Sequence, residues 1–324
     1  MVRRFPSLDR GCLLAGCLLV AGFGSCGKPV DGSGGRHEPR PEHTAWQEAL
    51  WVDALPPRHV GHPERLAALE QIAARLRGYG FEAELKRFRL PDSTPHWGGM
   101  ELANLVARRG PTCQQTILLG THWDTRAVAD EEIDPVLAGL PVPGFNDGTS
   151  GVAVLLDIAR RMQARTELPF GIEIVMFDAE EGVKGTDLYF TGSKRFASEL
   201  AAGEVACYRA AVVFDMVADR DYLVRAEDLS FRGYPWLYEE LFRHGDRAVF
   251  RPEPGRMIFD DHLALMARGI PSALVIDLDY PHWHKRTDTK ENCSPVSLQQ
   301  TADMAVRWLE EMIARGGEAG TSSP

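Results

Sequence analysis

The sequence predicts an α/β fold, a single domain with a central, mixed but mostly parallel sheet and helices on both faces. The first observation is a set of short apolar runs rich in β-branched residues, at 116–121, 172–177, 210–214 and 271–278. Such runs, which do not alternate with polar residues, are typical of strands buried on both faces of a parallel sheet. The second observation is that helical segments separate these runs, as in βαβ units. A chain of 324 residues, 44% of them hydrophobic, is long enough for one large core.

The N-terminal residues 1–25 have the composition of a signal peptide of the lipoprotein type. A basic start containing Arg3 and Arg4 precedes the apolar and small residues 11–25, which are fewer than the about 20 that a membrane-spanning helix needs. Phe23-Gly24-Ser25-Cys26 resembles a bacterial lipobox, so a lipid on Cys26 would be the one membrane attachment. Ordinary secretion without a lipid is the alternative. In both cases we expect export to the bacterial cell envelope, in the periplasm or at the outer membrane, or secretion.

The composition also divides the rest of the chain and limits its partners. Residues 26–44 are predicted to form a flexible tether rich in Gly, Pro, Ser and charge, 45–316 one folded domain, and 317–324 a disordered tail. The net charge of −10 argues against a nucleic-acid partner, which requires a basic face. Beyond the tether, the cysteines Cys113, Cys207 and Cys293 allow at most one disulfide, and the sequence leaves its pairing open.

Helix and strand boundaries follow from periodicity and from Gly and Pro positions. The segment 63–80 has apolar residues at three- and four-residue spacing, with Pro63 at its start and glycines at its end, which predicts an amphipathic helix. An edge strand at 81–90 and a strand at 101–107 should follow. Further helices are predicted at 152–162, 192–200, 236–243 and 263–267, and an amphipathic helix at 295–315 closes the domain.

Five residues of metal-ligand type lie at or just past the ends of predicted strands: His122, Asp147, Glu181, Asp215 and His284. The carboxyl ends of parallel strands share one edge of a sheet, where open α/β folds carry their sites. Taken alone, Asp147 would be an N-cap and the Glu180-Glu181 pair a solvated acidic turn. Together, nitrogen and carboxylate ligands with little thiol predict a zinc site.

The number of metals is left open by these residues. All five ligands, with Asp147 shared, would bind two metals a few ångström apart. Asp147, Glu181 and His284 would suffice for one catalytic zinc with an open position. In either case Glu180 is predicted to be the general acid/base. Asp124 follows His122 by two residues and is predicted to orient its imidazole.

The order of these motifs resembles the zinc aminopeptidase superfamily and, within it, the animal-type glutaminyl-peptide cyclotransferases and their bacterial relatives. The motifs are HxD at 122–124, GxNDxxSG at 144–151, EE at 180–181, Asp215, DDH at 260–262 and WH at 283–284. The resemblance implies a single zinc aminopeptidase-like catalytic domain, with Asp147, Glu181 and His284 as zinc ligands and Glu180 as the proton shuttle.

The two branches of the superfamily imply different roles for the remaining residues. In a cyclotransferase, Asp215 and Asp260 would hold the substrate amine and Trp283 would form an aromatic wall. In an aminopeptidase, His122 and Asp215 would complete a second zinc site. The DDH motif, Trp283 and the long segment 182–191 are similar to the cyclotransferases. Asn146–Gly151, the absence of tryptophan from 182–191, the absence of histidine near Leu274, and Lys285 in place of threonine point to the peptidases.

We therefore expect an enzyme that binds zinc and acts on peptide or protein N-termini, most simply as a monomer. The first hypothesis is a one-zinc glutaminyl-peptide cyclotransferase, which converts N-terminal Gln to pyroglutamate and releases ammonia. The second is an exported two-zinc aminopeptidase. The third is a catalytically inactive zinc-binding surface protein, since a fold does not determine function.

Overall fold

The computed structural model describes residues 40, 42–113 and 115–316. The predicted signal peptide with Cys26, nearly all of the predicted tether and the predicted C-terminal tail lie outside these residues. Among the described residues, no helix has the length and apolar character needed to cross a membrane.

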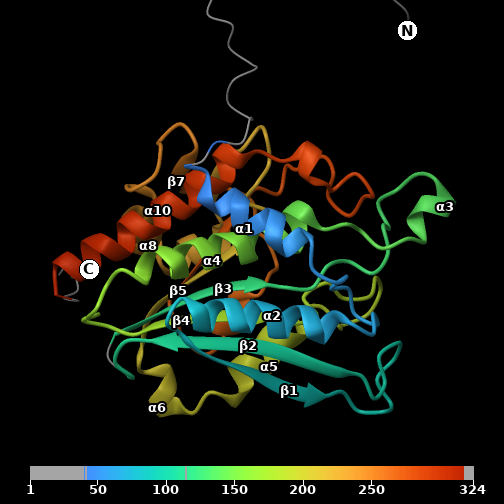
Figure 1. The fold of residues 1–324 in the computed structure, drawn as a ribbon, viewed down its shortest axis with the longest axis horizontal. Helices are drawn as coiled ribbons and strands as arrows, with labels where there is room; N and C mark the ends of the chain where they lie inside the picture. The colour runs from blue at the N-terminus through green and yellow to red at the C-terminus, as the bar shows by residue number, and fades with distance from the viewer. Residues whose placement is uncertain (1–39, 41, 114, 317–324) are drawn as a thin grey trace, which may run out of the picture. The chain divides into compact units, whose positions relative to one another are not determined.

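A six-stranded mixed sheet forms the centre of the described domain (Figure 1). Its order is β1-β2-β4-β3-β5-β8, and the strands are β1 (Glu82–Arg89), β2 (Glu101–Arg109), β3 (Thr116–His122), β4 (Ile172–Phe177), β5 (Tyr208–Asp215) and β8 (Ser272–Ile276). β1 and β2 pair antiparallel, as do β2 and β4, while β4, β3, β5 and β8 run parallel. This mixed, mostly parallel sheet agrees with the predicted fold class, which is confirmed. Its four parallel strands end at one edge of the sheet.

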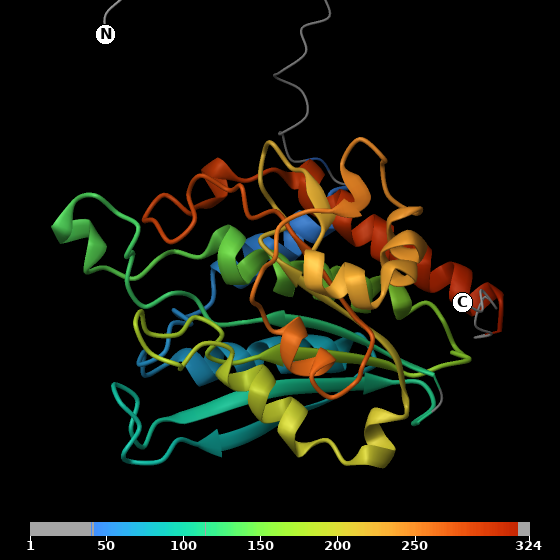
Figure 2. The ribbon, with the colours of Figure 1, turned by 180° about the vertical axis from the view of Figure 1, so that it is seen from behind.

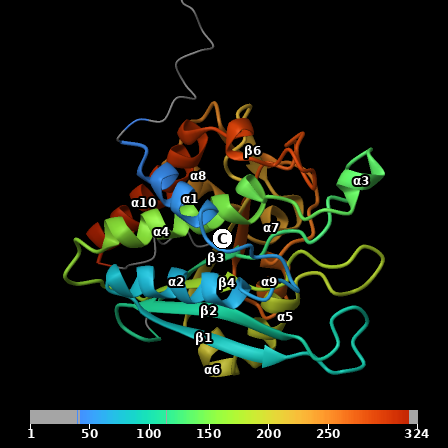
Figure 3. The same cartoon turned by 45° about the vertical axis from the view of Figure 1, so that its right-hand side comes forward.

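Helices cover both faces of the sheet. On one face lie α2 (Arg65–Gly78) and α4 (Gly151–Met162), with α1 (Thr44–Asp53), α8 (Pro235–Phe242) and α10 (Pro295–Ala314) on the same side (Figure 1). On the other face lie α5 (Thr191–Glu199) and α9 (His262–Met266), which Figure 2 shows in front of the sheet, and α6 (Ala202–Val205). The short helix α3 (Pro135–Ala138) stands on a long loop away from the sheet (Figure 3).

Several elements were not predicted from the sequence. They are α1, α3, α6, α7 (Asp228–Gly233), the turns η1 (Phe145–Ser150) and η2 (Lys290–Asn292), and a parallel pair of short strands, β6 (Val224–Ala226) and β7 (Phe250–Pro254). β6 has only three residues and β7 ends in a proline, so neither has the apolar run on which strand prediction depends.

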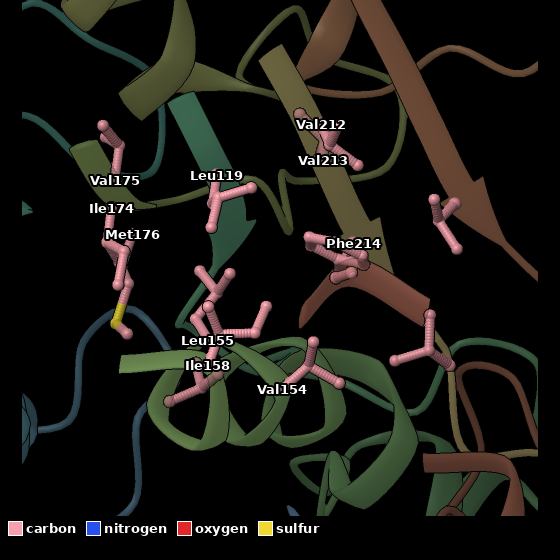
Figure 4. Close-up of a cluster of buried hydrophobic side chains, with 14 of the residues drawn as sticks. Leu119, Val154, Leu155, Ile158, Ile174, Val175, Met176, Val212, Val213 and Phe214 are labelled. Carbon is pink, nitrogen blue, oxygen red and sulfur yellow. The ribbon is translucent and has the colours of Figure 1, made fainter. Parts of the chain in front are cut away.

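The core between α4 and the sheet is continuous and fully buried. Figure 4 shows Leu155 and Ile158 of α4 facing Leu119 of β3. We expect Leu155→Ala to lower the free energy of unfolding by about 2–5 kcal/mol, because it leaves a cavity in a close-packed core. Urea denaturation would measure the loss. The matched truncation Ile133→Ala, at a side chain that is 98% exposed, should change it by less than about 0.5 kcal/mol. Equal effects of the two substitutions would contradict the packing described.

A disulfide joins Cys113 to Cys207, and Cys293 is a buried free thiol. The two bridged cysteines are 94 residues apart, so the bond closes a long loop in the unfolded chain. We expect its loss in the double variant Cys113→Ser/Cys207→Ser to lower the free energy of unfolding by about 2–5 kcal/mol. In thermal denaturation, a reductant should lower the Tm of the wild type and leave that of the double variant unchanged. A wild-type Tm that is the same with and without reductant would contradict this expectation.

Candidate metal centre and active site

The predicted site residues meet at the edge where the parallel strands end. His122 and Asp215 are the last residues of β3 and β5, and Glu180 and Glu181 follow β4. Asp147 lies in η1, and the loop after β8 carries Trp283 and His284. Asp260 lies just before α9. A cavity of about 150 Å³ is lined by all of these residues except His122. The structure therefore brings together residues that are far apart in the sequence.

The first metal-type group consists of Asp147, Glu181 and His284, whose ligand atoms lie within 4.8 Å of one another. His284 Nε2 is 3.4 Å from Glu181 Oε2 and 3.7 Å from Asp147 Oδ2. Asp147 Oδ2 and Glu181 Oε1 are buried and accept no hydrogen bond from the described residues. Two buried, unpartnered carboxylate oxygens beside an imidazole nitrogen fit a bound cation, and this donor set fits zinc.

The charges of this group explain why it requires a partner. Burial and the neighbouring Glu181 carboxylate raise the pKa of Asp147 well above its usual value. Burial also disfavours the charged form of Glu181, but His284 and Arg126 outweigh it and lower the pKa of that carboxyl. Adjacent carboxylates in a buried site stabilise each other's protonated form unless a positive charge lies between them.

The second group consists of His122, Asp147 and Asp215. Here the imidazole itself contacts the carboxylates, since His122 Nε2 lies 3.0 Å from Asp215 Oδ1 and 3.3 Å from Asp147 Oδ1. His122 Nδ1 lies 3.1 Å from the backbone carbonyl of Asp124. Although burial opposes the charged form, the carboxylates of Asp215, Asp124 and Asp147 raise the pKa of His122 well above its usual value. These carboxylates therefore favour the charged form of the imidazole.

The Asp124 carboxylate lies at ion-pair distance from His122, as predicted, but its hydrogen bonds go elsewhere. The nearer carboxylate oxygen, Oδ1, is 3.8 Å from His122 Nδ1. It accepts instead from the backbone N–H of Glu180 at 3.2 Å, while Oδ2 accepts from that of Glu181 at 3.3 Å. Asp124 therefore fixes the turn that carries both glutamates, and a backbone carbonyl orients the imidazole.

Glu180 lies beside both groups and belongs to neither. Burial, together with the charges of Glu181, Asp260 and Asp261, raises its pKa well above the usual value. Burial and the Asp215 charge likewise raise the pKa of Asp260 to about 6. Carboxyls whose pKa is raised in this way are suited to general acid/base chemistry.

The cavity is lined by acidic and by apolar side chains. Ile258, Phe259, Ile276 and Leu278 contribute apolar surface. Trp283, which is 37% exposed, stacks on His284 with ring centroids 3.8 Å apart. A larger hollow of about 490 Å³ lies at the opposite ends of the parallel strands, beside the disulfide, and contains none of the predicted site residues.

The backbone around the site is held in sparsely populated conformations. Ala179, Phe190, Met216 and His284 are non-glycine residues with φ between 44° and 57°. Gly148 has a φ of 109°, and a Cβ there would lie 2.4 Å from the Asp124 carbonyl oxygen, so only glycine fits this turn. Such conformations require a surrounding structure that enforces them, and they gather at functional sites.

Four contributing residues were not predicted from the sequence. Asp288 accepts from the backbone N–H groups of Asn146, at 2.8 Å, and Asp147, at 3.1 Å, and so holds the turn that carries Asp147, the residue common to the two groups. Tyr189 lines the cavity from the segment in which the sequence has no tryptophan. Arg126 and Asp130 contact two members of the first group. None lies in a periodic element, so no pattern indicated them.

Comparison with known proteins agrees with this geometry. The model of peptidase family M28 matches residues 104–309. The alkaline phosphatase isozyme conversion protein of Escherichia coli K12 is 25% identical over 151 residues, 44% of either chain, so the match spans less than half of that relative. The glutaminyl-peptide cyclotransferase of Bothrops jararaca is 23% identical over 310 residues, 82% of either chain.

Among the solved structures, a glutaminyl cyclase is similar to this chain. The glutaminyl cyclase of Porphyromonas gingivalis superposes with a TM-score of 0.76 and 25% identity, over 84% of this chain and 98% of that one. The M28 match covers more than half of the 324 residues and contains the ligand-bearing strand ends from His122 to His284. The chain belongs to peptidase family M28.

Proposed function

We propose that the protein is a zinc-dependent glutaminyl-peptide cyclotransferase, which converts the N-terminal Gln of peptides to pyroglutamate and releases ammonia. The observation that carries the proposal is the difference between the two metal-type groups. The unpartnered oxygens belong to Asp147 and Glu181 of the first group, whereas His122 hydrogen-bonds to Asp215 in the second. Asp147 belongs to both groups, but its unpartnered Oδ2 is the oxygen near His284, so the donor atoms of the first group favour one metal over two. The similarity to cyclotransferases over 82% of the chain supports the same choice.

Asp147, Glu181 and His284 Nε2 would hold the zinc ion, and three protein ligands leave a position open for substrate. Zinc bound there would polarise the side-chain carbonyl of the substrate Gln and stabilise the developing negative charge.

The protein side chains would manage the protons and the orientation of the amine. The substrate α-amine attacks the side-chain carbonyl carbon, a C–N bond forms, and the bond to the amide nitrogen breaks to release ammonia. Glu180 would take the proton from the attacking amine and give one to the departing nitrogen. Asp215 and Asp260, which both line the cavity, would orient the amine. Trp283 would flank the ring as it closes.

A two-zinc aminopeptidase is the second candidate. It is favoured by the second group, whose ligand atoms also lie within 4.8 Å of one another and share Asp147 with the first. In that reaction Glu180 would activate water for attack on the first peptide bond, and His122 would have to release Asp215.

A paired assay on the purified, zinc-loaded protein tests the proposal. One substrate is a Gln-initiated peptide followed by mass spectrometry, and the other a Leu-initiated peptide. We expect loss of ammonia from the first and no change in the second. Release of free leucine would establish the aminopeptidase. If neither peptide is converted although zinc is bound, a non-catalytic role would be favoured.

We also propose that the protein is exported and monomeric, with 1–25 as a lipoprotein signal peptide, 26–44 as a tether, 45–316 as the catalytic domain and 317–324 as a disordered tail. The Cys113–Cys207 disulfide supports an oxidising compartment such as the periplasm. Cys26→Ser should abolish lipid labelling of the mature chain, and unchanged labelling would rule out Cys26 as the attachment point.

A further inference from the structure

We propose that Asp130, held in place by Arg126, is a positioning residue that sets which nitrogen of His284 faces the metal. Arg126 contacts both oxygens of Asp130, with Nε donating to Oδ1 and Nη2 to Oδ2, each at 2.7 Å. The Arg126 side chain is only 2% exposed. A bidentate salt bridge of this kind fixes the plane of the carboxylate. The inference rests on the proposed function only in requiring that the site binds zinc.

The fixed carboxylate faces the side of the imidazole that points away from the ligands. Asp130 Oδ1 is 3.3 Å from His284 Nδ1. On the other side of the ring, Nε2 is directed at Glu181 and Asp147. A carboxylate beside Nδ1 favours the tautomer that carries its proton on Nδ1, which leaves Nε2 with a free lone pair for the metal.

The same guanidinium also orients a second ligand. Arg126 Nη1 donates to Glu181 Oε2 at 2.7 Å, which leaves the buried Oε1 as the oxygen without a hydrogen bond. One arginine therefore touches Glu181 directly and reaches His284 through Asp130.

The contacts extend to the loop that carries α3. Glu132 Oε1 accepts from the backbone N–H of Arg286 at 2.8 Å, two residues beyond His284. This hydrogen bond joins the α3 loop to the His284 loop beside the first metal-type group.

The test is zinc affinity, measured by competition with a chromophoric chelator on the full protein. We expect Asp130→Ala to weaken zinc binding about 10- to 100-fold, the usual cost of removing a group that orients a metal ligand. The matched control is Glu131→Ala, which removes the same charge from the next residue. That carboxylate is 3.4 Å from Lys184 Nζ and is 42% exposed, so its loss should change affinity less than about twofold.

A second variant separates orientation from folding. Asp130→Asn keeps the shape and an oxygen that can accept from Nδ1, so we expect an affinity between those of wild type and Asp130→Ala. The visible spectrum of the cobalt-substituted protein should shift in both Asp130 variants and remain unchanged in Glu131→Ala. An Asp130→Ala affinity equal to that of Glu131→Ala would overturn the proposal. If Asp130→Ala does not fold, a wild-type cobalt spectrum in Asp130→Asn would overturn it.

The affinity measurements are independent of turnover. If the variants follow the expected order but no Gln peptide is cyclised, the positioning role stands and the proposed function fails. If cyclisation occurs but the Asp130 variants bind zinc as tightly as wild type, the function stands and the positioning role fails. A wild-type chain that binds no zinc overturns both.

Discussion

Glu180→Gln is expected to lower kcat on a Gln-initiated peptide by about 10²–10⁴-fold while zinc remains bound. Glutamine has the shape of the carboxyl but cannot take a proton from the amine. Glu180 lies outside both metal-type groups, so its replacement leaves Asp147, Glu181 and His284 in place. Steady-state kinetics and the zinc content of the purified variant would measure the two effects separately.

The matched control for this substitution is Glu181→Gln. It makes the same chemical change one residue later, but it removes a carboxylate of the metal group and should therefore lower zinc content as well as activity. Full activity in Glu180→Gln would show that another group moves the proton. Loss of zinc from Glu180→Gln would show that it is a ligand instead.

His284→Ala is expected to abolish activity and to weaken zinc binding by more than the about 10- to 100-fold that loss of a merely orienting group costs. It reduces the three metal-type side chains of the first group to two. His122→Ala should retain one zinc per chain, because the structure places that imidazole in hydrogen bonds with carboxylates. Metal analysis of both variants after exhaustive dialysis would give the ratio of zinc to protein.

The histidine pair also separates the two candidate functions. If the wild type holds two zinc ions and His122→Ala holds one, the second group is a metal site and the aminopeptidase becomes the better assignment. If His284→Ala retains its zinc at full affinity, the first group is not the metal site.

The sheet was largely predictable from local sequence. Residues 117–119 are apolar throughout and 172–177 are apolar except for Glu173, and the structure places them in β3 and β4, buried on both faces. The closing helix α10 follows its apolar periodicity. These elements were predictable because burial on both faces, or on one helical stripe, requires a pattern that is visible within a few residues. The segments β6 and β7 lack such a pattern.

The positions of the candidate ligands were predictable for a related reason. His122 and Asp215 end their strands, and parallel strands bring their ends together whatever the loops between them do. The disulfide pairing was not predictable, since the choice among three cysteines depends on which loops meet in space.

By itself the sequence determined the fold class and the inventory of metal-type side chains, because hydrophobic periodicity and residue chemistry are local properties. The tertiary structure alone decided how these side chains are used. It placed the Asp124 carboxylate on the glutamate turn instead of on His122, and Asp130 behind His284. It also left Glu181 Oε1 without a partner while bonding His122 to Asp215. Hydrogen bonds and burial at this edge join residues up to 154 positions apart, as in the Arg286–Glu132 contact, so no local pattern records them.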